Sequence, residues 1–309
     1  MAADDPMGCA PDDDVPIPYM ARTRAYYAAI GYTTPYRWAH HLDAPFLRLR
    51  KPLSHCRVAL VTTAAPYDPA KGDQGPDAPY NSAAKFYSVY DGDSAKTHDL
   101  RISHIAYDRA HTSAADSGTW FPLPRLRQLA REGRIGAVAP RFFGAPTNRS
   151  HRATCDTDAP EILARCLKDH VDAAVLVPNC PVCHQTVSLV ARHLEAHGVA
   201  TVVIGCAKDI VEHAAVPRFL FSDFPLGNSA GRPNDPASQA ITLELALRLL
   251  EAAPAGQTTL HSPLRWSADP GWKHDYNNVA ALSAEELARR RRDFDAQKQI
   301  ARGMREGAA

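Results

Sequence analysis

A pair of cysteines between an expected strand and an expected helix constrains this chain more than any other feature. Residues 173–177 form an unbroken apolar run of strand length, which Pro178 and Asn179 end. Apolar residues at helical spacing follow as far as Gly198, and a second apolar run occupies 201–204. This order predicts a β-α-β unit with parallel strands, because a crossover helix joins parallel strands.

The two cysteines, Cys180 and Cys183, fall where the first strand ends and the helix begins. Open α/β sheets bind ligands at this place. The free backbone N–H groups and the dipole of a helix start favour a thiolate, and a Cys-x-x-Cys arrangement lowers the pKa of its first sulfur. The pattern predicts a redox-active pair with a nucleophile and a resolving thiol. The alternatives are half of a zinc site, which lacks a second Cys-x-x-Cys, and two buried inert thiols.

Alternating strand and helix signals predict the fold class. Besides the β-α-β unit, strands are expected at 57–63, 100–105, 135–139 and 218–221, and helices at 21–30, 123–130, 160–168 and 237–250. Asp158 is the expected N-cap of the helix at 160–168. The pattern is that of an α/β protein with an open, mostly parallel sheet flanked by helices, in layers of the flavodoxin or Rossmann kind.

The chain is expected to have an N-terminal extension and a C-terminal helix around this core. The predicted parts are a disordered tail with Cys9 (1–15), an N-terminal helical clamp (16–56), an α/β catalytic core of one or two lobes (57–255), and a loop with a charged helix (256–309). The charged helix starts at a capping box, Ser283 to Glu286.

Composition excludes several classes of function. The 309 residues carry a formal net charge of +1, without a basic stripe with interleaved aromatic residues, so no nucleic acid or membrane partner is expected. The sequence contains no apolar run near the roughly 20 residues of a membrane span and no Gly-x-Gly-x-x-Gly or P-loop motif. The acidic start is unlike a signal peptide, and seven scattered cysteines are unlike a disulfide-stapled domain. We expect a cytoplasmic protein with a small-molecule substrate.

A second polar cluster follows the expected strand at 100–105. It contains His104, Tyr107, Asp108, His111 and Asp116. Imidazole and carboxylate groups together suit a general acid with an orienting partner, or a metal site. The alternative is that Tyr107 and Asp108 only organise a turn.

For some further residues, either a functional or a purely structural role would explain their position in the sequence. His40, in an aromatic segment with Trp38, is kept as a site candidate, although such residues more often pack or lie on the surface. Cys206 also ends a strand, and either shares the edge of the site or is a buried inert thiol. The loops 64–93 and 222–236 are expected to shape access to the site.

Three stretches match the motifs of one known family. Cys180-Pro-Val-Cys183 stands between strand and helix, RISHIAYD precedes WFPLPRLRQLAREGRIGAVAPR, and FPLGNSAGRPND follows the strand at 218–221. They resemble the selenocysteine-x-x-cysteine pair, the Ser-His-x-x-Tyr and Phe-Pro-x-x-Arg-Leu-x-x-Leu segments, and the Pro-Leu-Gly-Asn-Pro loop of the selenoprotein B subunits of the glycine, sarcosine, betaine and D-proline reductases. The likeness covers residues 57–250, and PYMARTRAYY resembles the cysteine-containing members without selenium.

The resemblance implies a thiol-based oxidoreductase that cleaves a carbon–heteroatom bond of a small molecule. Cys180 would attack, Cys183 would resolve the adduct, and His104 and Tyr107 would bind substrate or deliver a proton. A thioredoxin-like reductant or carrier protein would regenerate the pair, and no tightly bound cofactor is expected. Because cysteine is a harder nucleophile and a poorer leaving group than selenocysteine, the glycine or betaine reaction itself is not transferred.

Further residues around these are expected to bind substrate, and assembly into a homo-oligomer remains open. The expected substrate-binding residues are Asp108, His184, Thr186, Gly227 and Asn228.

Two other functions remain open. A metal-dependent lyase or hydrolase would hold zinc or iron with Cys180, Cys183 and either His104 or His184, since thiolate and imidazole suit both metals. A non-catalytic subunit of a multi-protein reductase would use the charged C-terminal helix, with its arginine run at 289–292, as a docking face.

Overall fold

The expected β-α-β unit lies at the centre of the molecule. The computed structural model describes residues 14–32, 34–147 and 150–306. The parallel strands β7 (Ala173–Val177) and β8 (Ala200–Gly205) are joined by α5 (Pro181–Ala196). The predicted tail with Cys9 lies outside the described residues, apart from positions 14 and 15.

One sheet contains eight of the described strands, in the order β10-β9-β8-β7-β1-β6-β3, with β5 also paired to β1. The pairs described are parallel, except that β3 runs antiparallel to β6. The other strands are β1 (Arg57–Thr62), β3 (Tyr90–Asp93), β5 (Ala137–Val138), β6 (Arg141–Gly144), β9 (Arg218–Phe221) and β10 (Thr258–His261). The open, mostly parallel sheet is confirmed, and it continues past residue 255 to include β10.

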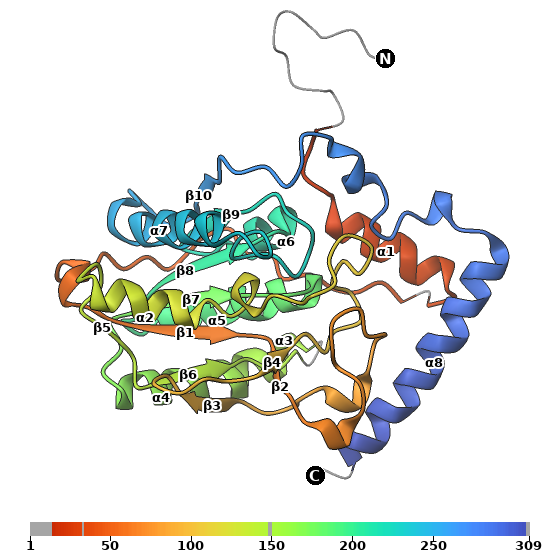
Figure 1. The fold of residues 1–309 in the computed structure, drawn as a ribbon, viewed down its shortest axis with the longest axis horizontal. Helices are drawn as coiled ribbons and strands as arrows, with labels where there is room; N and C mark the ends of the chain where they lie inside the picture. Colours follow the sequence, from red (N-terminus) through yellow and green to blue (C-terminus); the bar gives the residue numbers. More distant parts are fainter. Residues whose placement is uncertain (1–13, 33, 148–149, 307–309) are drawn as a thin grey trace, which may run out of the picture.

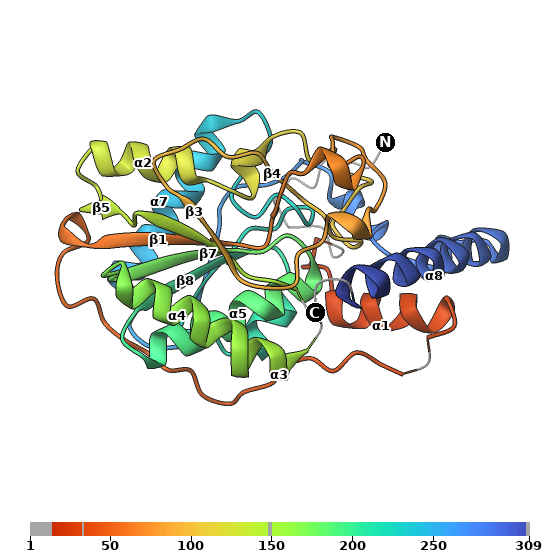
Figure 2. The same ribbon diagram turned by 90° about the horizontal axis from the view of Figure 1, so that it is seen from below.

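Helices cover both faces of the sheet (Figures 1 and 2). α2 (Leu123–Arg131) and α7 (Pro236–Ala252) cover one face, and α4 (Ala159–Lys168), α5 and α6 (Lys208–His213) cover the other. Successive residues of β1 enter the two cores, Leu60 on the α7 side and Val61 on the α5 side. Burial on both faces explains why the central strands are continuous apolar runs rather than alternating ones.

The N-terminal and C-terminal helices lie side by side beyond the carboxyl ends of the strands (Figure 1). α1 (Tyr19–Ala29) and the turn that follows it contact α8 (Ala284–Glu306) through aromatic rings. The ring centres of Tyr27 in α1 and Tyr32 in the turn lie 5.5 and 4.9 Å from that of Phe294. The hydroxyl of Ser283 accepts a hydrogen bond from the backbone N–H of Glu286 at 3.1 Å, as the capping box predicts. Among the described helices, none is long and apolar enough to cross a membrane.

Short single-turn helices connect the main elements. They are Leu53–His55, Pro69–Lys71, Ser82–Ala84, Ser117–Thr119, Pro270–His274 and Val279–Ala281.

The strand expected at 100–105 is wrong. Only Leu100–Arg101 (β4) is extended, and it pairs with β2 (Ala65–Pro66) in a separate two-stranded sheet. The chain then turns across the carboxyl edge of the main sheet, where the backbone N–H of Asp108 donates to the carbonyl of Leu226 at 2.9 Å. A contact with a distant loop therefore overrides the local strand preference.

The expected N-cap at Asp158 is also wrong. α4 continues from α3 (His151–Ala153) through a π-helical turn, Thr154–Asp158, so Asp158 has a helical backbone and its side chain does not cap. The cap lies earlier, where the hydroxyl of Ser150 accepts from the N–H of Ala153 at 3.1 Å.

Candidate active site

The site lies where the chain changes its direction of travel across the sheet. After β1 the chain builds β6 on one side of it and then returns to build β7 on the other side. Ligands bind at such switch points, outside the carboxyl ends of the strands. Thr63 follows β1 and Cys180 closely follows β7, so both belong to this edge.

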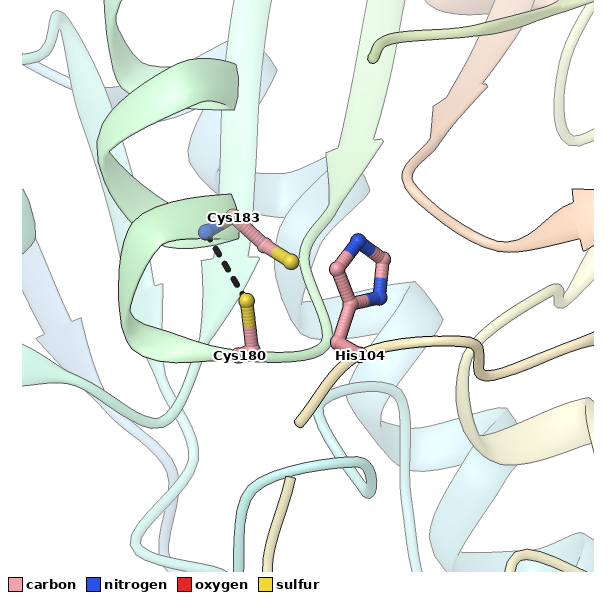
Figure 3. A group of neighbouring side chains, drawn as sticks. All are labelled: His104, Cys180 and Cys183. Carbon is pink, nitrogen blue, oxygen red and sulfur yellow. Dashed lines mark hydrogen bonds between the residues drawn. The ribbon is translucent and has the colours of Figure 1, made fainter. Parts of the chain in front are cut away.

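Cys180 is the N-cap of α5. Its backbone is extended, and Sγ accepts a hydrogen bond from the backbone N–H of Cys183 at 3.2 Å (Figure 3). Pro181 occupies the first helical position, where a missing N–H has no cost. Cys180 and Cys183 are 4% and 0% exposed, so solvent has little access to either sulfur at the start of the helix.

His104 is the third member of the group. One ring nitrogen of His104 and the two sulfurs all lie within 4.8 Å of one another. Figure 3 shows the imidazole ring and Sγ of Cys183 turned toward each other. His104 is 5% exposed, and neither ring nitrogen makes a well-directed hydrogen bond to another described residue. The structure therefore brings His104 together with both cysteines.

The two thiols differ in acidity. Burial raises the pKa of Cys180 well above its ordinary value, and its hydrogen bond to Cys183 adds to this. Burial also acts to raise the pKa of Cys183, but the hydrogen bond from Cys180 and the closeness of His104 and Thr63 outweigh it and bring this pKa well below the ordinary value. The pKa is thus shifted upward at Cys180 and downward at Cys183, whereas the motif predicted a lowered pKa at the first sulfur, Cys180.

His184 connects the ends of two neighbouring strands. Its Nδ1–H donates to the carbonyl of Cys180 at 2.8 Å, and Nε2 accepts from the backbone N–H of Cys206 at 2.9 Å. Burial lowers the pKa of His184 to about 4, so the ring is neutral. A Cβ at Gly205 would lie 2.7 Å from the ring, which only glycine avoids. Both ring nitrogens are used within the protein, so His184 holds the Cys180 turn in place.

Tyr107 and Asp108 lie close to the group but have other partners. The guanidinium of Arg109 covers the Tyr107 ring at 3.9 Å from its centre. Asp108 is buried and accepts from Nδ1 of His111 at 3.0 Å. Burial raises the pKa of Asp108, against the effect of His111. These contacts organise the turn around the site.

The remaining predicted binding residues support loops and helix packing. Thr186 is buried in α5, and Gly227 adopts φ +108°, a conformation suited to glycine. Asn228 donates to the carbonyl of Pro225 at 3.1 Å. Burial raises the pKa of Cys206 to about 12, as expected for an inert thiol.

Comparison with known proteins identifies the family. Residues 30–179 match the family model described as glycine/sarcosine/betaine reductase selenoprotein B. A D-proline reductase subunit gamma from Acetoanaerobium sticklandii is 32% identical over 212 residues, which are 67% of this chain and 84% of that protein. The chain belongs to the selenoprotein B family.

Other relatives in this family are longer than the chain. A glycine reductase complex component B subunit gamma from Symbiobacterium thermophilum is 29% identical over 236 residues, 74% of this chain and 53% of that protein. A betaine reductase complex component B subunit beta from Peptoclostridium acidaminophilum is 25% identical over 187 residues, 58% of this chain and 41% of that protein. The chain thus spans about half of such subunits. No solved structure gives a significant match.

In this selenoprotein B family member, aromatic residues that the sequence did not assign to the site cover the cysteines. Tyr36 and Trp38 pack against Cys180 and Cys183, and Gln185 holds Tyr36 through a 2.7 Å hydrogen bond to its hydroxyl. The same two rings line a surface groove of about 700 Å³, together with arginines 24 and 37. The rings therefore stand between the sulfurs and the groove. Trp38 was noticed in the sequence, but its distance along the chain gave no sign of this contact.

Three further polar residues at the site were missed. The hydroxyl of Thr147 donates to Sγ of Cys183 at 3.5 Å, and the hydroxyl of Tyr276 donates to the carbonyl of Ala106 at 3.0 Å. Asn179 is fully buried, and within the described chain its amide has no hydrogen-bond partner. Only Asn179, next to Cys180 at the end of a strand, carried a signal in the sequence. His40, kept as a candidate, is exposed beside His213 and is not in the group.

Proposed function

We propose that this selenoprotein B family member is a thiol-based reductase that cleaves a carbon–heteroatom bond of a small molecule. The observation that carries the proposal is the cysteine pair itself. Its two buried sulfurs lie together at the start of α5, at the switch point of the sheet, with an imidazole beside them. The relatives, named as subunits of D-proline, glycine and betaine reductases, support reductive chemistry.

In the proposed reaction, Cys180 attacks the substrate. Cys183 first takes the proton of Cys180, and the thiolate left on Cys180 is stabilised by the N–H of Cys183 and the start of the helix. Attack on a substrate R–Y forms an S–R bond and releases Y, which takes a proton. Cys183 then attacks the sulfur of Cys180, so that R leaves with a proton as R–H and a disulfide forms. In sum, R–Y and two thiols give R–H, H–Y and a disulfide.

His104 is the proposed proton donor for the leaving group. Its ring lies beside Cys183 and has both nitrogens uncommitted to other described residues, so it can take the proton from Cys183 and pass it on. Tyr107 remains a proposed neighbour of the substrate rather than a direct participant, since Arg109 covers its ring.

Substrate and reductant are proposed to enter from the groove beside Tyr36 and Trp38. Both sulfurs are closed off in this structure, so these rings must move before a dithiol carrier of the thioredoxin kind can reduce the disulfide. The relatives named as complex components support protein partners for this chain as well. The reduced state of a Cys-x-x-Cys pair fits the cytoplasm.

The test is turnover of candidate substrates by the purified chain with a small dithiol. Cys180→Ser should abolish turnover. Cys183→Ser should react more slowly in the first step, because it lacks the thiolate that takes the proton of Cys180, and should then retain the substrate fragment as a covalent adduct visible by mass. Cys206→Ser is the matched control, because Cys206 is also a buried cysteine and burial raises the pKa of its thiol. Full turnover by Cys180→Ser would refute the mechanism. Turnover by the isolated wild-type chain would also exclude a purely non-catalytic subunit.

A further inference from the structure

We propose that the reduced cysteine pair and His104 form a binding site for a thiophilic metal ion, Zn²⁺ in particular. Two sulfurs and one imidazole nitrogen lie within 4.8 Å of one another, and all three side chains are more than nine-tenths buried. This spacing suits three ligand atoms around one ion, since Zn–S and Zn–N bonds measure about 2.3 and 2.0–2.1 Å.

The state of His104 points to a ligand at the same place. A buried imidazole without directed hydrogen bonds is unfavourable, and buried polar groups in proteins are nearly always paired. Within the described chain neither of its ring nitrogens is paired, although the ring faces Sγ of Cys183 (Figure 3). A metal ion that takes one nitrogen lone pair would satisfy the ring and link it to both sulfurs.

The chemistry of the three donors selects the ion. Thiolate and imidazole ligands favour Zn²⁺ or Cu⁺, whereas Mg²⁺ and Ca²⁺ require oxygen ligands. The group found among the described residues contains no carboxylate. Three protein ligands leave one position of a zinc tetrahedron open for a small molecule.

Metal binding and disulfide formation exclude each other because they use the same sulfurs. The ion binds both sulfurs as thiolates, any proton still on them is released, and no atom changes oxidation state. A disulfide offers no thiolate. The metal-bound protein is therefore inactive as a thiol reductase, and the metal protects the pair from oxidation.

The test uses Co²⁺ as a spectroscopic probe and Zn²⁺ as a competitor, with the full chain reduced by a phosphine and freed of chelator. Wild type should bind one Co²⁺ per chain with thiolate-to-cobalt charge-transfer absorption, and Zn²⁺ should remove this absorption. Oxidation of the pair should abolish it. Cys180→Ser and Cys183→Ser should lose it, and His104→Ala should bind more weakly. Cys206→Ser and His40→Ala should behave as wild type.

Two results would overturn the metal site: no charge-transfer absorption in the reduced wild type, or absorption that persists unchanged in Cys183→Ser or His104→Ala. Dithiol-dependent turnover of metal-free protein is measured on the same samples. Turnover without cobalt binding refutes only the metal site. Cobalt binding without reversible disulfide formation refutes the reductase and leaves the metal site standing.

Discussion

The two ends of helix α5 bury polar groups in opposite ways. At its C-terminal end, Glu195 accepts from the N–H of Leu47 at 2.7 Å, from the N–H of Thr201 at 2.6 Å and from Arg218 at 2.8 Å. At its N-terminal end, two thiols face His104, whose ring nitrogens lack a directed bond to any described residue. Both carboxylate oxygens of Glu195 therefore have partners, whereas the ring nitrogens of His104 have none among the described residues.

This difference indicates that the C-terminal end of α5 serves the stability of the fold and the N-terminal end serves the chemistry of the site. The buried ion pair of Glu195 and Arg218, in which both carboxylate oxygens accept hydrogen bonds, fixes the N-terminal segment around residue 47 against the sheet. Unpaired groups at the other end add little to stability and remain available to a ligand. Substitutions at the two ends should therefore have opposite effects, which the following predictions test in order of decreasing size.

His104→Asn should lower turnover by about 10²–10⁴-fold, the usual contribution of general acid catalysis. Its free energy of unfolding should stay close to that of wild type, because the ring makes no directed bonds that are lost. Steady-state kinetics and chemical denaturation measure the two quantities. His40→Asn, at an exposed histidine, is the control. A loss of stability without a loss of turnover would show that His104 is a packing residue.

Glu195→Gln should lower the free energy of unfolding by about 3–5 kcal/mol, since it leaves Arg218 buried without its counter-charge. The rate of disulfide formation at the other end of α5 should not change. Glu212→Gln removes an exposed carboxylate in a surface pair and should cost less than about 1 kcal/mol. Equal effects of the two substitutions would contradict the structural role given to Glu195.

His184→Gln should flatten the dependence of stability on pH. In the folded protein the pKa of His184 is lowered from 6.5 to about 4 by burial. The unfolded chain therefore binds a proton that the folded one rejects as pH falls from about 6.5 to about 4, and wild type should lose about 3 kcal/mol in this window. Denaturation at a series of pH values measures the slope. An unchanged slope in the variant would mean that another group is responsible.

Trp38→Ala should raise the rate of alkylation of the reduced cysteine pair by roughly tenfold, since it removes part of the cover between the sulfurs and the groove. Labelling followed by peptide mapping measures the rate at each thiol. Cys166, buried in the core on the α5 side of the sheet, should label slowly in both proteins. If the Trp38 variant labels at the wild-type rate, access follows a different route.

The sequence could predict those parts of the cysteine site that depend on the pattern of neighbouring residues in the chain. An apolar run, a strand stop and helical spacing fix Cys180 and Cys183 at a strand-to-helix junction, and the structure has them there. His104 was also among the predicted site residues, although the strand predicted at 100–105 ends at Arg101 and does not include it. Its loop is held by contacts with residues more than a hundred positions away, to which local propensity is blind.

The rest of the site depends on such distant contacts. Thr147, which donates to Cys183, is separated from it along the chain by a π-helical turn that the sequence pattern did not predict. Tyr36 is held by a hydrogen bond from Gln185. The role of His184 depends on the carbonyl and N–H groups of two adjacent strand ends, which become neighbours only when β7 and β8 pair. Spacing in the sequence marks a histidine there but not its partners.

The most direct test of the central claim is the intact mass and thiol count of the purified chain before and after dithiothreitol, with peptide mapping of any disulfide. We predict that mild oxidation removes two hydrogen atoms and two free thiols, that the disulfide joins Cys180 to Cys183, and that dithiothreitol reverses it fully. Thiols at both positions that stay reduced under oxidation in metal-free protein, or a disulfide that joins other cysteines, would contradict the account.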